Sequence, residues 1–214
     1  MTQPVLESSL QMPLAAALEI MQQRIVDGRT TYFGVPTLKN PLDFWVYQEL
    51  ISRRVPDVII EIGNMHGGSA LALAHQLDLH GKGRVIAIDV NHRRLFDLPR
   101  SHPRIEFIEG DAVAMLPDVM QRIPAGADVM VIEDSSHTFD NTLAVLRAYS
   151  PLVQPGQYFV VEDSICHHGL DVGPSPGPYE AIEAFIAETD AFEVDRSIES
   201  FLITWNPKGF LKRT

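Results

Sequence analysis

The stretch from Val58 to Ala74, VIIEIGNMHGGSALALA, constrains the fold of this chain most. It starts as an unbroken apolar run that closes on a carboxylate, Glu61, and such a run is typical of a buried parallel strand. A glycine-rich turn follows, and the small apolar residues after it indicate a helix whose first turn approaches a ligand closely. The stretch therefore predicts the first crossover of a nucleotide-binding sheet. An ordinary tight turn, in which glycine supplies only a positive φ, is the alternative.

The glycine spacing narrows the class of ligand. Gly63, Gly67 and Gly68 give E-x-G-x-x-x-G-G-S, whereas a dinucleotide-binding turn has G-x-G-x-x-G, whose glycines make room for a pyrophosphate. The pattern thus favours a ligand without a phosphate to hold. Glu61 suits a cationic group such as the amine of S-adenosylmethionine (SAM). We expect Ser69, which opens the helix, to contact the same ligand together with Gly63 and Gly67.

Length and charge limit the class of protein. A chain of 214 residues, 45% of them hydrophobic, suits one α/β domain over 1–214, with N-terminal helices and a substrate-side loop in 1–55 and the sheet in 56–214. The formal net charge of −11 comes with no basic cluster. It argues against a nucleic-acid partner and against an anionic membrane surface, because both are bound through clustered positive charge.

Cysteine content and the N-terminus bear on the compartment. Cys166 is the single cysteine, so neither an intrachain disulfide nor a cysteine-rich metal site can form, and a reducing, cytoplasmic compartment is expected. The first 23 residues carry acidic residues within their apolar part and lack a basic start, which predicts an amphipathic helix and not a signal peptide. No run approaches the roughly 18 apolar residues of a membrane span.

Helical periodicity marks two elements before the sheet. Leu14, Leu18, Met21 and Ile25 predict a first helix, expected to pack beside the main sheet. A second helix is predicted over 42–54, after Pro41. The segment 30–41 between them has two prolines and a glycine, so it is expected to be a loop. Its Tyr32-Phe33 pair either plugs the edge of the core or forms part of a binding mouth.

A strand-helix rhythm follows, in which each apolar run ends on an acid. It predicts a doubly wound, Rossmann-like parallel sheet with these acids along one edge, and hence the ligand site there. The expected strands are 57–61, 84–89, 104–108, 128–133 and 158–162. The expected helices are 69–79, 112–122 and 138–150, and 91–98 is expected to be a helix or an irregular segment. Beyond them we expect an irregular lid at 165–178, a helix at 179–189 and an antiparallel strand pair at 192–195 and 201–205.

Two strand-end acids fit a nucleoside. Asp89 ends the second strand, where nucleoside-binding folds place a carboxylate on the ribose hydroxyls; a solvated strand-end acid is the alternative. Asp111, after the third strand, lies where it would meet the adenine. It also stands directly before the helix at 112, where it would cap that helix, and the two roles are compatible.

Three further acids point to a metal. Asp134 follows the fourth strand, and Glu162 and Asp163 follow the fifth, so adjacent strand ends about 5 Å apart bring the carboxylates together beside the cofactor, which Asp134 is also expected to touch. Three converging carboxylates repel one another unless a cation lies among them, and all-oxygen ligands select a hard ion such as Mg²⁺. Individually exposed acids are the alternative.

His137 is the candidate base. It stands three residues after Asp134, within reach of a hydroxyl held on the metal, and its ordinary pKa near 6.5 lets it accept a proton at neutral pH. A polar residue at a helix start is the alternative. His167 and His168 on the lid are weaker candidates, and Cys166 beside His167 resembles a catalytic pair only in sequence.

The motifs together resemble one family. YFGVPTLKNPLDFWVYQEL, DVIIEIGNMHGGSA, IEDSSHT, GQYFVVEDSI and FLITWNPKGFLKR are similar to segments of the cephalosporin hydroxylase and rhamnosyl O-methyltransferase family. The resemblance runs from about Tyr32 to the C-terminus and implies a class I SAM-dependent methyltransferase fold. It also implies a Mg²⁺ site on Asp134, Glu162 and Asp163, and assembly into a homo-oligomer through the N-terminal helices.

A more distant similarity concerns the base. In catechol-type O-methyltransferases a lysine three residues after the first metal-binding aspartate takes the proton, and that position is His137 here. The sequence thus predicts a SAM- and Mg²⁺-dependent O-methyltransferase acting on a hydroxyl of a small molecule, a natural product or sugar, with His137 and Asp134 as catalytic residues. A nicotinamide-dependent oxidoreductase and a non-catalytic SAM- or nucleoside-binding module are the alternatives.

Overall fold

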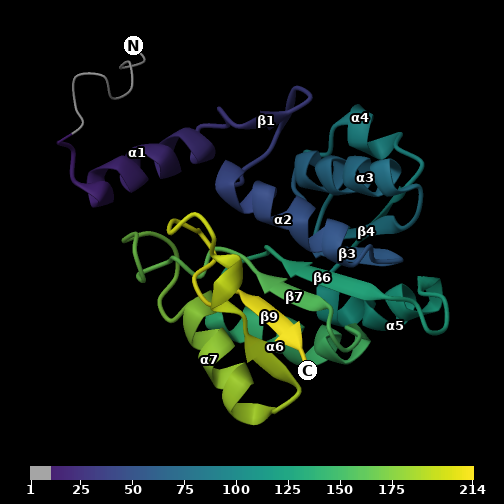
Figure 1. The fold of residues 1–214 in the computed structure, drawn as a ribbon. Helices are drawn as coiled ribbons and strands as arrows, with labels where there is room; N and C mark the ends of the chain where they lie inside the picture. Colours follow the sequence, from purple (N-terminus) through teal and green to yellow (C-terminus); the bar gives the residue numbers. More distant parts are fainter. Residues whose placement is uncertain (1–10) are drawn as a thin grey trace.

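The computed structural model describes residues 11–214, so the part of the predicted amphipathic helix that falls on 1–10 lies outside it. A seven-stranded sheet in the order β5-β4-β3-β6-β7-β9-β8 forms its centre, and β9 runs in the opposite direction to the other six strands (Figure 1). The strands are β3 (Val58–Ile62), β4 (Arg84–Asp89), β5 (Ile105–Glu109), β6 (Val129–Glu133), β7 (Tyr158–Val161), β8 (Phe192–Val194) and β9 (Phe210–Arg213). The predicted doubly wound sheet is confirmed.

Helices cover both faces of the sheet. On one face lie α2 (Pro41–Arg53), α3 (Gly68–His80) and the short α4 (Asp97–Arg100). On the other lie α5 (Ala112–Arg122), α6 (Phe139–Tyr149) and α7 (Pro178–Glu188), as Figure 1 shows for α6 and α7. Because strand side chains alternate, β3 supplies Ile60 and Ile62 to the α5–α7 core and Ile59 to the α2–α3 core. All five β3 residues are buried, as expected for a central parallel strand.

The sheet topology fixes where a ligand can bind. Strand order runs outward from β3 to β5 on one side and from β6 to β7 on the other, so the chain changes direction between β3 and β6. A crevice opens outside the carboxyl ends of the strands at such a point. Backbone hydrogen bonds continue the ladder past the strand ends there: Asp134 N donates to Ile62 O (2.8 Å), and Glu162 N donates to Glu133 O (2.9 Å).

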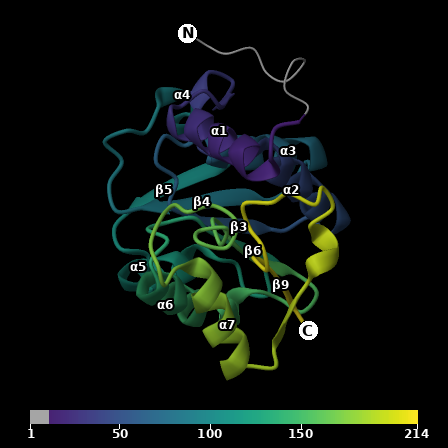
Figure 2. The ribbon, with the colours of Figure 1, turned by 90° about the vertical axis from the view of Figure 1, so that its left-hand side faces the viewer.

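The first helix was predicted to pack beside the sheet, and this prediction was wrong. α1 (Leu14–Val26) places Leu18 and Ile25 against Ile165 and Leu170 of the 165–178 loop and against Trp205. Figures 1 and 2 show α1 beyond the carboxyl ends of the strands, on the same side as that loop. The sheet faces are already covered by α2, α3 and α5–α7, so the apolar side of α1 packs over the loop instead.

The strand predicted at 201–205 was also wrong. That segment is irregular, with Leu202 at φ +62° and 97% exposed, and the antiparallel strand lies further on, at Phe210–Arg213. Its apolar alternation comes from separate contacts: Trp205 packs on α1, while its backbone N–H donates to Asp43 instead of joining a ladder. β9 inserts between β7 and β8, and the 3-10 turns Ser150–Leu152 and Arg196–Ile198 complete this region.

Smaller differences concern loops. The predicted loop 30–41 contains a two-residue hairpin, β1 (Thr31–Tyr32) and β2 (Val35–Pro36). The segment 91–98, predicted as helical or irregular, is irregular until the single turn of α4. Among the described residues, no helix combines the length and the apolar character that crossing a membrane requires.

Asp43 of α2 ties the N-terminal and C-terminal parts of the chain together. Its buried carboxylate accepts hydrogen bonds from Thr204 Oγ1 (2.6 Å), Trp205 N (2.9 Å) and Asn40 Nδ2 (3.0 Å). Asp43→Ala should lower the free energy of unfolding by about 3 kcal/mol, because three buried donors lose their partner.

Urea denaturation would measure this loss. The control is Glu49→Ala on the same helix, since Glu49 makes only an exposed pair with Arg53 at 3.5 Å. The control should stay within about 0.5 kcal/mol of the parent chain. A similar small change in Asp43→Ala would show that the C-terminal segment is not held this way.

Candidate functional site

The predicted acids gather at the carboxyl ends of β3, β4, β6 and β7, around a cavity of about 760 Å³. This volume lies in the usual range for small-molecule sites. Of the predicted site residues, the cavity wall includes Gly63, Ser69, Asp89, Asp111, Asp134, His137 and Asp163. It does not include Glu61, Gly67 or Glu162.

Glu61 lies beneath the cavity. It is one residue before the end of β3, on the face that carries Ile59, so its side chain points toward α2 and α3 and is 0% exposed. Burial raises the pKa of Glu61 to about 7, in spite of the nearby charge of Lys39. Among residues 11–214 its oxygens make no close hydrogen bond, although the side chain of Ser69 lies near enough to lower its pKa. The structure thus places Glu61 behind the cavity wall, and its predicted contact with the ligand stays a prediction.

The glycine-rich turn fits tightly against its neighbours. Gly63 has φ +86°, and a Cβ there would lie 2.0 Å from the backbone oxygen of Asp134. Gly67 has φ +83° at the start of α3, and a Cβ there would meet Leu95 and Pro99. Gly63 therefore allows the turn after β3 to contact the turn after β6, and Gly67 allows it to contact the segment after β4. Their positions explain the spacing by backbone conformation and close approach.

Asp89 is oriented by this same turn. Its Oδ2 accepts hydrogen bonds from Asn64 N (3.0 Å) and Met65 N (2.8 Å), and its Oδ1 accepts one from Asn91 N (3.3 Å). Asp111 caps α5, since its Oδ1 accepts from Ala114 N (2.9 Å), so the predicted capping role is confirmed. Both acids also line the cavity, as the predicted nucleoside contacts require.

The acid cluster, defined as Asp134, Glu162 and Asp163, lies around a lysine. Lys39 Nζ is 2.5 Å from Asp134 Oδ2 and 2.5 Å from Glu162 Oε1, and Lys39 is only 6% exposed. Strand alternation explains the meeting: Asp134 and Glu162 continue the faces of Ile132 and Val160, which point toward α2. Sequence reasoning missed Lys39, although its ammonium lies where a cation among these acids was predicted.

Further side chains fix the cluster. Tyr47 of α2 donates from its hydroxyl to Glu162 Oε1 (2.7 Å), and Asn206 Nδ2 donates to that hydroxyl (3.2 Å). Asn206 Oδ1 accepts from Asp163 N (3.0 Å). Neither Tyr47 nor Asn206 was predicted from the sequence, because helical spacing explains Tyr47 as a core residue and Asn206 falls in an irregular segment.

His137 joins the cluster from the opposite side to Lys39. Its Nε2 lies 3.4 Å from Asp163 Oδ2 and 4.0 Å from Asp134 Oδ1. Both His137 and Asp163 have left-handed backbones, with φ +57° and +55°, which side chains other than glycine adopt at a cost. The structure therefore brings His137 to the acids, as predicted, by two strained turns.

Burial and the neighbouring charges shift the pKa values of the cluster residues in opposite directions. Burial raises the pKa of Asp134 to about 6 and that of Glu162 to about 7, although Lys39 lowers both. Burial also raises the pKa of Asp163. For His137 and Lys39 burial acts to lower the pKa, but the surrounding carboxylates outweigh it and raise the pKa of both groups. The acids thus hold the two basic groups in their charged forms, while burial opposes the charge on the acids themselves.

The lid histidines lie apart from the acid cluster's contacts. His168 Nε2 pairs with Glu180 at 2.7 Å, and His167 Nδ1 pairs with Asp171 at 2.8 Å. Cys166 is buried and lines the cavity, and burial raises the pKa of its thiol to about 11, which keeps it protonated. The Tyr32-Phe33 pair packs on His75 of α3 and does not line the cavity. The loop reaches the cavity instead through Pro36, Thr37, Leu38 and Lys39.

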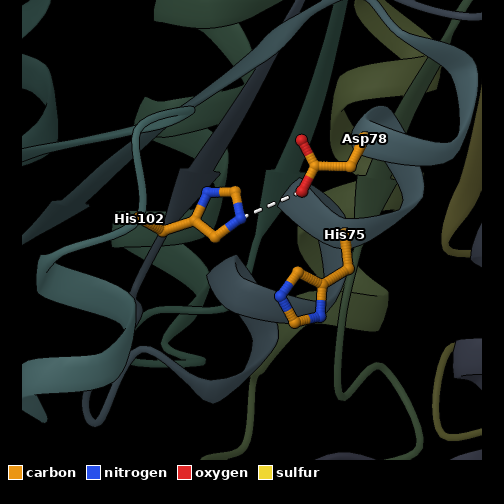
Figure 3. A group of neighbouring side chains, drawn as sticks. All are labelled: His75, Asp78 and His102. Carbon is orange, nitrogen blue, oxygen red and sulfur yellow. Dashed lines mark hydrogen bonds and ion pairs between the residues drawn. The ribbon is translucent and has the colours of Figure 1, made fainter.

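Among the described residues, two groups of side chains lie close enough together to hold a metal ion: Asp134, His137 and Asp163 at the acid cluster, and His75, Asp78 and His102 on and beside α3 (Figure 3). Arg104 Nε donates to Asp78 (2.5 Å), and Arg104 N donates to His102 Nδ1 (3.3 Å). The proton of His102 is therefore on Nε2, which faces Asp78 at 3.1 Å. With that nitrogen donating and an arginine on the carboxylate, the group ties residues 102–104 to α3.

Comparisons with known proteins agree with this fold. The family model Rhamnosyl O-methyltransferase/CmcI matches residues 24–214. The chain is 35% identical over 192 residues to a rhamnosyl O-methyltransferase of Mycobacterium tuberculosis, covering 86% of this chain and 78% of that protein. It is 36% identical over 194 residues to the rhamnosyl O-methyltransferase of Mycobacterium leprae, covering 86% and 83%.

Solved structures share the fold at lower identity. A CmcI structure described with Mg and SAM has a TM-score of 0.69 at 21% identity, covering 99% of this chain and 89% of that one. The O-methyltransferase TomG of Streptomyces achromogenes, described in complex with SAM, has a TM-score of 0.58 at 21% identity, covering 86% and 83%. These likenesses confirm the predicted class I methyltransferase architecture.

Proposed function

This chain belongs to the Rhamnosyl O-methyltransferase/CmcI family, and from that premise we propose that it transfers a methyl group from SAM to a hydroxyl of a small molecule, a sugar hydroxyl in particular. The observation that carries the proposal is the acid cluster, which reaches the cavity wall through Asp134 and Asp163 and contains the buried ammonium group of Lys39. The names of the mycobacterial relatives support a sugar as the acceptor.

The cavity wall fits SAM. Asp89 presents its oriented carboxylate for the ribose hydroxyls, and Asp111 lies further along the same wall for the adenine. The side-chain amide of Asn64 is 3% exposed, lines the cavity and has no hydrogen-bond partner among the described residues, so it is available to the amino-acid part of the ligand. The ligand supplies a methyl group activated by its sulfonium sulfur.

The acid cluster fits Mg²⁺, because its donors are carboxylate oxygens and because a cation already lies between two of them. Asp134, Glu162 and Asp163 would hold the ion, which would supply positive charge that lowers the pKa of an acceptor hydroxyl. Tyr47 and Asn206 orient Glu162 and Asp163, while Glu133 holds the turn after Asp134 by accepting from Ser135 N (3.3 Å).

His137 is proposed to take the hydroxyl proton on Nε2, the nitrogen that faces Asp134 and Asp163. As the acceptor oxygen forms its bond to the methyl carbon, the bond from that carbon to sulfur breaks, and S-adenosylhomocysteine leaves. The two carboxylates then stabilise the protonated imidazole. The pattern matches a general base oriented by acids on a rigid turn.

Binding of S-adenosylhomocysteine should depend on Asp89. Asp89→Ala should weaken it by about 10- to 100-fold in calorimetry, since hydrogen bonds to a charged group are lost. Asp89→Asn, which keeps one acceptor oxygen for the turn, should fall between, and Asp97→Ala on α4, which is exposed and does not line the cavity, should match the parent. Binding of NAD in place of S-adenosylhomocysteine would favour the oxidoreductase alternative instead.

Chelation should stop methyl transfer. EDTA should abolish turnover and added Mg²⁺ should restore it, because the proposed hydroxyl activation needs the ion. Asp134→Ala should remove activity without unfolding the chain, whereas Asp140→Ala, an exposed acid on α6, should leave it unchanged. Full activity in EDTA would remove the metal from the mechanism.

Replacing His137 should reveal the base. His137→Ala should lower kcat by about 10²- to 10⁴-fold while affinity for S-adenosylhomocysteine stays unchanged. Activity of the parent should rise with pH through the pKa of His137, because only neutral imidazole accepts a proton, and this acidic limb should vanish in the variant. His80→Ala, an exposed histidine at the end of α3, is the control. If His137→Ala keeps most of kcat and the acidic limb of the pH-rate profile, His167 or His168 becomes the candidate base.

A further inference from the structure

We propose that Lys39 is a built-in competitor of the metal: its ammonium group neutralises the acid cluster in the metal-free protein and has to leave when a divalent cation binds. The inference rests on the proposed function, since it concerns the same site. It assigns a role to a residue that lies outside the predicted metal ligands.

The first argument is the position of the ammonium group. Lys39 Nζ is 2.5 Å from one oxygen of Asp134 and 2.5 Å from one oxygen of Glu162. A Mg²⁺ ion bound to the same two oxygens at its usual 2.0–2.1 Å would nearly coincide with the nitrogen. At so short a separation the two cations repel each other strongly, because their Coulomb energy is large in a buried site. Metal and ammonium therefore exclude each other.

The second argument is the hydrogen bonding around Glu162. Its Oε1 already accepts from Tyr47 as well as from Lys39, so the ammonium takes part in a complete network. Tyr47 in turn is held by Asn206. Without a metal, this network keeps two acids at one place that would otherwise repel each other. A lysine that keeps these acids in place also lowers the affinity of the site for any other cation.

The third argument is the route open to the displaced side chain. Lys39 is 6% exposed, and Asn40, which follows it, caps α2 by accepting from Leu42 N (3.2 Å). The backbone is thus fixed close to the site. Glu61 is buried near enough for its charge to act on the ammonium, and within residues 11–214 the Ser69 side chain is its one polar neighbour besides these charged groups. A displaced ammonium group therefore has a buried carboxylate close to its first position.

Replacement of the Lys39 ammonium group by a metal ion would also affect the cavity wall. Pro36, Thr37 and Leu38 precede Lys39 and line the cavity. Thr37 packs on the start of α3 so closely that a Cβ on Gly68 would lie 2.0 Å from its Oγ1. Lys39 itself lines the cavity, so a new position of its side chain changes the cavity wall while the backbone stays in place.

Metal binding by the whole chain tests the inference without turnover. Mn²⁺ binding is measured by the electron paramagnetic resonance signal of the free ion, and Mg²⁺ binding by calorimetry. Lys39→Met, which keeps length and removes charge, should bind Mn²⁺ about tenfold more tightly or better, because a buried competing charge is gone. Lys39→Arg keeps the charge and should not. Lys82→Met removes an exposed charge that pairs with Asp57 at 3.0 Å, and its affinity should equal that of the parent.

The outcomes separate this inference from the proposed function. Equal or weaker Mn²⁺ binding by Lys39→Met than by the parent overturns the competition and leaves metal-dependent methyl transfer intact. Absence of Mn²⁺ binding in both proteins overturns the competition and the metal site together. If Lys39→Met unfolds without metal, Mn²⁺ should restore its thermal transition, since the ion replaces the missing charge. Failure of Mn²⁺ to restore it also overturns the inference.

Discussion

Carboxylates buried at the ends of parallel strands are the constraint on which the site depends. Parallel topology brings Asp134 and Glu162 to one edge and one face, and burial raises the pKa of each. Such a group of acids is stable only if cations and hydrogen-bond donors surround it. The N-terminal segment supplies Lys39 and Tyr47, and the C-terminal segment supplies Asn206. Segments outside the parallel strands are thus needed to stabilise the acids at the edge of the sheet.

The central sheet was predictable because its information is local. Unbroken apolar runs marked β3, β4 and β6 within one residue at either end, and the acids that close them came to one edge as expected. His137 was found by its spacing from Asp134. These features follow from strand periodicity and from the direction of parallel strands, both of which can be read from short segments.

Lys39 was missed because its partners are 95 and 123 positions away in the sequence. No periodic pattern marks such a pair, and a lysine before a helix is usually solvated. The strand wrongly expected at 201–205 failed for a related reason: Asp43, far away in the chain, holds Trp205 out of any ladder. Glu61 shows a third limit, since alternation decides whether a strand-end acid faces the cavity or the helix behind it. Predicting which face a side chain occupies requires knowing which helices pack on each face of the sheet.

The hydrogen bond from Asp163 N to Asn206 has a consequence for how the protein is made on the ribosome. Lys39 and Tyr47 are translated early, Asp134 and Asp163 much later, and Asn206 later still. At ordinary elongation rates on the order of ten seconds separate the first of these residues from the last. During that time the lysine has few of its final acidic partners, and the acids lack the amide that fixes their turn. The sheet can therefore begin to assemble as the chain is made, but the contacts at its edge become complete only in a late step of folding.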